Sequence, residues 1–167
     1  MLMDKMYPFM NEEVQIFMNI SDGYDALGEH DKAIKINYML IRSLGKGYMD
    51  KRNAEHLVAM LTFNTAQIYA GLGQYQRSIN MCQNAVKRAA KMHLVTVLPR
   101  AYGIIAWDMI QQAQEGQIEK SELEICRLYL RQGYAAASLS NQKALARTLE
   151  GIYRERFQQQ SVRHCRQ

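Results

Sequence analysis

The sequence has no apolar run that approaches the roughly 20 residues needed to span a bilayer. Its first ten residues include charged side chains and a proline, so they do not resemble a signal peptide. Cysteine is scarce, and the three present are an odd count without a disulfide pattern: Cys82, Cys126 and Cys165. We therefore expect a cytoplasmic protein with reduced thiols and no membrane contact.

Known catalytic and cofactor-binding motifs are also missing. There is no phosphate loop, dinucleotide fingerprint or serine-nucleophile elbow, and the histidines and cysteines lack the spacing of a zinc site. Glu12 and Glu13 are adjacent, so on a helix their carboxylates would point apart rather than share a substrate. The sequence therefore predicts a protein that is not an enzyme and that uses neither a metal nor a cofactor.

Proline is rare, with only Pro8 and Pro99, and valine and threonine are sparse. Alanine, glutamine, methionine and leucine are common, a balance that favours helix over sheet. Apolar residues make up 48% of the 167 residues, which is enough for a packed core. We predict a single all-α domain over residues 1–167.

One segment of the sequence occurs twice. The pattern Tyr, two residues, Leu-Gly, one residue, an aromatic or His, two residues, a small residue and Ile begins at Tyr24 and again at Tyr69. Gly28 and Gly73 are expected to end a helix in the left-handed conformation, which glycine adopts without steric penalty. The two glycines are 45 residues apart, so the repeat predicts stacked helix hairpins. A four-helix bundle is the alternative, but it would need no repeated turn.

Apolar residues at helical spacing extend this pattern along the chain. They predict about seven helices, as pairs and a final helix at 12–45, 52–93, 97–138 and 140–158, followed by a flexible basic tail at 159–167. Three helix starts are expected from capping chemistry, at Asp31, at a capping box Ser121–Glu124, and at Ser140 or Asn141.

The Leu-Gly turns resemble those of the tetratricopeptide repeat (TPR) family over roughly residues 12–158, although that family's period is 34 residues. The resemblance implies a right-handed superhelix of antiparallel helix pairs with a concave binding surface. Residues 129–141 and 144–157 resemble the end of the C-terminal sensor domain of bacterial peptide-sensing transcriptional regulators. Those regulators carry an N-terminal helix-turn-helix domain, which this sequence does not contain. We expect either a piece of such a regulator, binding DNA only through that missing domain, or a free-standing repeat protein.

The TPR pattern also implies which residues line the concave groove. Asn19 and Asn64 occupy the same repeat position, where an amide can pair with the backbone of an extended peptide. Arg100 would pair with a carboxylate, while Trp107 would provide apolar contact. The alternative is that the two asparagines are solvated surface residues and Trp107 belongs to the core. The implied groove residues are Met18, Asn19, Phe63, Asn64, Gln67, Arg100 and Trp107.

Charge is unevenly distributed. Residues 1–55 carry seven basic and nine acidic side chains, whereas residues 56–167 carry fourteen basic and seven acidic ones. No acidic residue lies between Glu55 and Asp108, which favours an anionic partner group there or simply a basic surface. The leading expectation is a module that binds a short peptide or protein segment. The alternatives are a scaffold for folded proteins and a direct nucleic-acid binder, and the final helix is expected to cap the array or form a homodimer.

Overall fold

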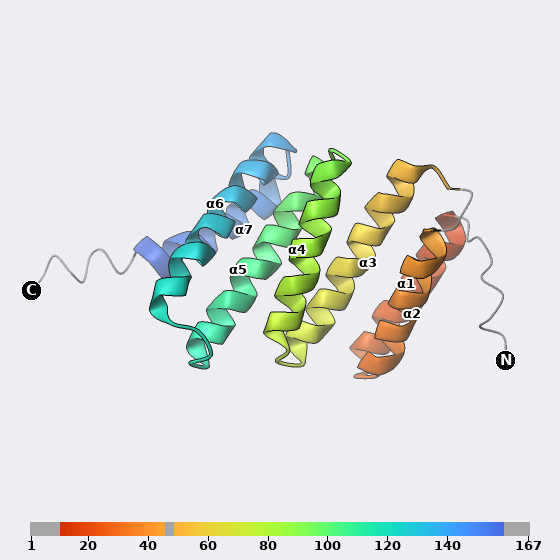
Figure 1. The fold of residues 1–167 in the computed structure, drawn as a ribbon, viewed down its shortest axis with the longest axis horizontal. Helices are drawn as coiled ribbons and strands as arrows, with labels where there is room; N and C mark the ends of the chain where they lie inside the picture. Colours follow the sequence, from red (N-terminus) through yellow and green to blue (C-terminus); the bar gives the residue numbers. More distant parts are fainter. Residues whose placement is uncertain (1–10, 46–48, 159–167) are drawn as a thin grey trace, which may run out of the picture.

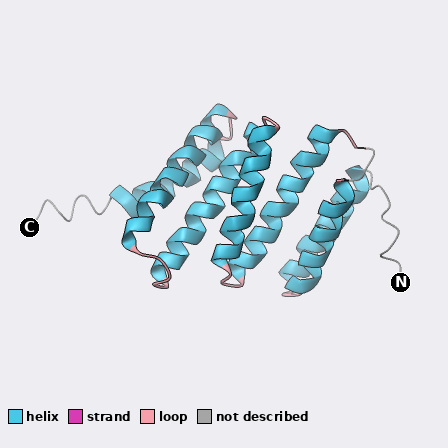
Figure 2. Cartoon of the chain, viewed as in Figure 1, coloured by secondary structure: helices cyan, strands magenta, loops and turns pink. Residues whose placement is uncertain are grey.

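The computed structural model describes residues 11–45 and 49–158, and within these residues it contains seven α-helices and no β-strand (Figures 1 and 2). The helices are α1 (Asn11–Ala26), α2 (His30–Leu44), α3 (Lys51–Gly71), α4 (Tyr75–Lys91), α5 (Leu98–Gln114), α6 (Leu123–Leu139) and α7 (Lys143–Tyr153). Short 3-10 segments at Val95–Val97 and Lys120–Glu122 precede α5 and α6, and a π-helical turn at Arg154–Gln158 follows α7. The predicted all-α class with about seven helices is confirmed, while the predicted tail at 159–167 lies outside the described residues.

The helices lie side by side along the long axis of the molecule, from α1 and α2 at one end to α6 and α7 at the other (Figure 1). Each helix packs against the next one in the chain, and α5 also contacts both α3 and α7. The helices α3, α5 and α7, each of which starts a new unit of the array, are therefore neighbours in space, and α1 is linked to α3 by a side-chain hydrogen bond between Asp22 and Asn64. None of the helices that the structure describes is long and apolar enough to cross a membrane.

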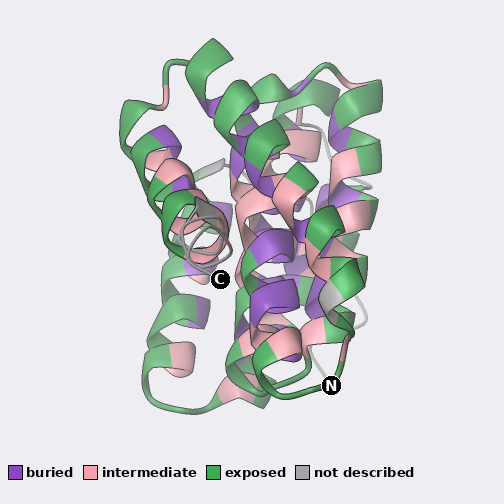
Figure 3. Cartoon of the chain, turned by 90° about the vertical axis from the view of Figure 1, so that its left-hand side faces the viewer, coloured by how far each residue is buried: buried purple, intermediate pink, exposed green. Residues whose placement is uncertain are grey.

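The buried residues lie between the helices in three clusters, with exposed residues on the outside (Figure 3). One cluster joins α3 to α7 and includes the fully buried Phe63 and Ile105, and a second joins α1, α2 and α3 around Leu40 and Leu61. Since α3 contributes to both clusters, it connects the two halves of the array. Burying such side chains contributes about 1.5–3 kcal/mol each to folding.

The repeated Leu-Gly turns have the predicted geometry. Gly28 has φ +76° and Gly73 has φ +72°, both in the left-handed region. After each glycine the chain reaches back to the preceding helix: the N–H of Glu29 donates to the carbonyl of Tyr24 over 2.9 Å, and the N–H of Gln74 donates to that of Tyr69 over 2.8 Å. These bonds satisfy carbonyls that would otherwise end the helix without a partner.

Three further helices end in the same way, two of them without glycine. Gly116 ends α5 at φ +71°, but His93 and Asn141 adopt φ +53° and +58° after α4 and α6. The N–H groups of Leu94 and Gln142 complete the turns by donating to Ala89 and Ala137 over 2.9 and 2.8 Å. The sequence also predicts a helix end at Gly116, whereas the turns at His93 and Asn141 lie outside the Leu-Gly pattern because histidine and asparagine, which are enriched in the left-handed region, take the place of glycine there.

Gly23, inside α1, and Gly28, in the turn that follows it, allow a test of whether the left-handed φ of the turn requires glycine. A Cβ at Gly23 or at Gly28 would meet no atom within 4 Å, so the two sites differ mainly in φ. We expect Gly28→Ala to lower the free energy of unfolding by about 1–2 kcal/mol because of left-handed strain. The control Gly23→Ala should raise it by about 0.5–1 kcal/mol, since alanine favours a helix interior. Urea unfolding followed by circular dichroism measures both, and equal effects would contradict the assignment.

The predicted helix caps are wrong. The residue before α2 is Glu29, not Asp31, and its side chain makes no capping bond. Glu122 precedes α6 and accepts a hydrogen bond from the N–H of Glu119, so Ser121–Glu124 forms no capping box. Gln142 rather than Ser140 or Asn141 precedes α7. Left-handed turns at Gly28 and Asn141 lie two residues before α2 and α7 and fix where these helices begin, whereas α6 continues from the 3-10 segment Lys120–Glu122.

Two glycines hold α7 close to the rest of the array. A Cβ at Gly103 of α5 or at Gly133 of α6 would lie only 3.0 Å from a methyl carbon of Leu149. Leu149 is 2% exposed, so it is used for packing within the chain and is not available for a dimer contact. The absence of a side chain at both glycines therefore lets α7 approach α5 and α6 closely.

Candidate functional site

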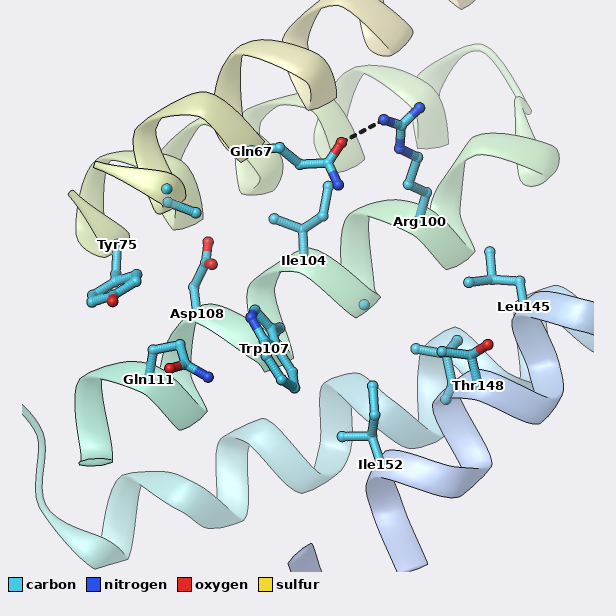
Figure 4. Close-up of a pocket in the computed structure, with 14 residues that line it drawn as sticks. Gln67, Tyr75, Arg100, Ile104, Trp107, Asp108, Gln111, Leu145, Thr148 and Ile152 are labelled. Atoms are coloured by element: carbon cyan, nitrogen blue, oxygen red, sulfur yellow. Dashed lines mark hydrogen bonds between the residues drawn. The ribbon is translucent and has the colours of Figure 1, made fainter. Parts of the chain in front are cut away.

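A pocket of about 550 Å³ lies where α3, α5 and α7 face one another, with Tyr75 from the start of α4 at one end (Figure 4). Its apolar walls come from α5 and α7, and most of its polar groups come from α3 and α5. This volume lies within the range of about 300–1,000 Å³ that is common for ligand sites. The lining residues are Gln67, Ala70, Gly71, Tyr75, Arg100, Gly103, Ile104, Trp107, Asp108, Gln111, Leu145, Thr148, Leu149 and Ile152.

A network of polar side chains beside this pocket links α1, α3 and α5. Nη2 of Arg100 donates to the side-chain oxygens of Asn64 over 2.9 Å and of Gln67 over 2.6 Å. Nδ2 of Asn64 donates in turn to Oδ1 of Asp22 over 3.3 Å. These side chains come from α1, α3 and α5, so the network orients Arg100 at one end of the pocket.

Arg100 keeps its positive charge in this setting. Partial burial lowers the pKa of its guanidinium, and the negative charge of Asp22 opposes that shift. Because a guanidinium is not deprotonated in proteins, the group remains a cation. Both protons of Nη2 are used by Asn64 and Gln67, and Nη1 contacts Sδ of Met60 at 3.9 Å, so a ligand carboxylate would be attracted by the charge and bound through Nε or the remaining Nη1 proton.

The structure brings together four of the seven residues assigned to the groove. Gln67, Arg100 and Trp107 line the pocket, and Asn64 joins them through its bond to Arg100. Trp107 is 46% exposed and therefore does not belong to the core. Asn19 is exposed but does not line this pocket, and its side chain accepts a bond from Gln15 one turn earlier in α1.

Met18 and Phe63 are not groove residues, and this part of the prediction is wrong. Phe63 is fully buried against the residues of α4 and α5, and Met18 is only 8% exposed and packs with α2 and α3. The reason is the position of α3, which has neighbours on several sides: α2, α4 and α5. Its apolar face is therefore wider than the repeat pattern implies, and it includes the position assigned to the groove.

Asp108 is a pocket residue that the sequence reasoning missed. Its side chain is 1% exposed, and among the described residues neither carboxylate oxygen has a hydrogen-bond partner. Burial raises the pKa of the Asp108 carboxyl to about 7, and the neighbouring Ser78 hydroxyl opposes that shift. An unpartnered buried carboxylate is costly, because it loses the hydration that stabilised its charge.

A sequence signal for Asp108 was present. Ile105, Asp108, Met109 and Gln112 have the spacing of one helix face, and all four are buried. A single acidic residue among apolar residues on such a face is an inconsistency of the kind that often marks a functional position. Asp108 was noted in the sequence only as the residue that ends a stretch without acidic side chains, and burial of its helix face was not considered.

Comparisons with protein-family models, with curated proteins and with solved structures found no match to this chain.

The thiols near the pocket are unsuited to nucleophilic chemistry. Burial raises the pKa of both Cys82 and Cys126 to about 12, so neither forms a thiolate near neutral pH. Within the described residues, no three His, Cys, Asp or Glu side chains are grouped so that they could hold a metal ion. Cys165 lies outside the described residues. What the pocket offers is apolar surface, amides and two opposite charges, which are means of recognition.

Proposed function

We propose that this chain is a binding module for a short peptide or an extended protein segment. The supporting observation is the pocket beside Arg100, which combines an oriented cation, side-chain amides and an exposed tryptophan on apolar walls. Extended peptides require such a combination, because their backbone needs polar partners and their side chains need apolar pockets.

We also propose that the helices form a TPR-like superhelix. Five helices ending in left-handed turns, with the first helices of the hairpins side by side, support a TPR-like superhelix. In that arrangement α1, α3, α5 and α7 form the inner surface, and the pocket lies on it. Together with the resemblance of the closing segment, this supports a role as the peptide sensor of a bacterial transcriptional regulator, in which a separate domain binds DNA. A cytoplasmic location belongs to the same proposal.

Direct nucleic-acid binding has less support. Arg88 forms a two-pronged ion pair with Glu55, with its closest contact at 2.8 Å, and the guanidinium of Arg77 lies 4.0 Å from the centre of the Tyr69 ring. These side chains in the basic region are already used within the protein. A phosphate backbone would have to compete with these contacts.

Trp107 is the only tryptophan, so its fluorescence reports on the pocket. We expect pools of random hexapeptides that include acidic residues to change this fluorescence and to raise the melting temperature. Arg100→Met should weaken binding about 10–100-fold, since a charged hydrogen bond contributes about 1.5–3 kcal/mol.

The control is Asn19→Ala, which should bind like the wild type because Asn19 lies outside the pocket. Circular dichroism would verify that Arg100→Met is folded. If no peptide pool changes the fluorescence or the melting temperature, peptide binding at this pocket is excluded. A folded protein partner would then be the remaining candidate.

A further inference from the structure

The pocket carries opposite charges at its two ends. Arg100 and Asp108 both belong to α5 and are eight residues apart, which corresponds to about 12 Å along the helix axis. Figure 4 shows Arg100 and Leu145 at one end and Asp108, Tyr75 and Gln111 at the other. The carboxylate whose charge raises the pKa of Arg100 is that of Asp22 on α1, and no ion pair within the described ranges joins Arg100 to Asp108.

Asp108, in contrast, has no counter-ion. No ion pair in the described part of the chain includes it, and both of its oxygens lack hydrogen-bond partners. Its polar neighbour Ser78 is uncharged. The Ser78 hydroxyl lowers the pKa of Asp108 as a donor would, although the contact lacks hydrogen-bond geometry and leaves both groups without a partner among the described residues. A carboxylate buried in this way is a strong acceptor for any cation that can reach it.

The surroundings of Asp108 suit a positively charged group. The aromatic rings of Tyr75 and Trp107 and the side-chain amide of Gln111 line the same part of the pocket. Aromatic faces attract ammonium and guanidinium groups, and an amide oxygen accepts their hydrogen bonds. Tyr75 and Gln111 are both half-exposed, and the Tyr75 hydroxyl donates to Glu115 over 2.8 Å, which holds its ring at this end of the pocket.

We propose that this end of the pocket binds a cationic group of the peptide ligand, an ammonium or a guanidinium, with Asp108 as its counter-ion. The inference rests on the proposed function and specifies its ligand. Opposite charges about 12 Å apart match an acidic and a basic group separated by about three to four residues of extended peptide. The ligand class is therefore a short peptide with charges of both signs.

The affinity for the cation should rise with pH. Burial holds the pKa of Asp108 at about 7, so its carboxyl becomes ionised between pH 6 and 8. The titratable groups whose pKa values respond to its charge are Tyr75 and Cys82, both on α4; both pKa values are raised, so these groups remain neutral in this range. A second acidic group at this end is Glu115, just after α5, which accepts a hydrogen bond from the Tyr75 hydroxyl over 2.8 Å.

The test compares hexapeptide pools with blocked ends and uncharged random positions, which differ at one fixed residue. Lysine at that residue is compared with acetyl-lysine, which has the same stem without the charge. A third pool carries arginine at that residue. A fourth has no basic side chain but a free N-terminus, so the four pools show whether the bound cation is a lysine, an arginine or the terminal ammonium group. Binding is measured through Trp107 fluorescence at pH 5.5 and pH 8 with wild type, Asp108→Asn and the control Asp31→Asn, an exposed residue of α2 that lies outside the pocket.

We expect at least one cationic pool to bind wild type and Asp31→Asn about tenfold more tightly than the acetyl-lysine pool at pH 8, with a smaller preference at pH 5.5. Asp108→Asn should bind cationic and neutral pools equally at both pH values. If the pools bind but charge makes no difference, or if Asp108→Asn keeps the preference, the cation site is wrong while the proposed function stands. If no pool binds, including the acidic pools used to test Arg100, both proposals fail.

Discussion

Replacing Asp108 with asparagine is expected to raise the free energy of unfolding at pH 8 by about 3–4 kcal/mol. The ordinary pKa of an aspartate is 3.8, and burial raises that of Asp108 to about 7. Between these values the folded protein holds a proton that the unfolded chain has released, so the wild type loses stability as the pH rises from about 4 to 7. Asparagine has nearly the same shape and no charge, so it removes this loss.

The measurement is urea unfolding of both proteins at pH 4, 6 and 8. At pH 4 the two should be nearly equally stable, since Asp108 is then protonated when folded. The difference should increase to pH 7 and then remain constant. Asp31→Asn serves as the control, because that side chain is exposed and its substitution should change stability by less than about 0.5 kcal/mol. A variant no more stable than wild type at pH 8 would show that Asp108 has a partner after all.

Phe63→Ala is expected to lower the free energy of unfolding by about 3–5 kcal/mol. The ring is fully buried in the cluster that joins α3 to α7, so its removal loses apolar contact and leaves a cavity. Trp107→Ala removes a larger side chain but should cost much less, because Trp107 is 46% exposed at the pocket. Denaturant unfolding at pH 7 measures both changes.

The same pair separates packing from binding. Trp107→Ala should fold normally and bind peptide pools more weakly, as measured by calorimetry because the fluorescent reporter is lost. If Phe63→Ala were as stable as wild type, or if Trp107→Ala were the more destabilised of the two, the assignment of Phe63 to the core and of Trp107 to the pocket would be contradicted.

The repeat pattern was reliable for features that depend on local sequence. It identified the turns at Gly28 and Gly73, because glycine in the left-handed region is a local property of the chain. It also placed Arg100 and Trp107, seven residues apart, on one face of α5, while the stacking of α3 beside α5 brings Gln67 to the same pocket. It failed at Phe63, whose burial depends on how many neighbours α3 has.

The helices, the glycine turns and the unequal distribution of charge follow from local sequence, because they depend on residues close to one another in the chain. Which helix faces are covered depends on tertiary packing. The close approach of α7 over Gly103 and Gly133 completes the pocket, and the packing of α4 against α5 buries Asp108 with no counter-ion among the described residues. Burial and the pKa shift that it causes depend on contacts between distant segments, and a single helix cannot specify them.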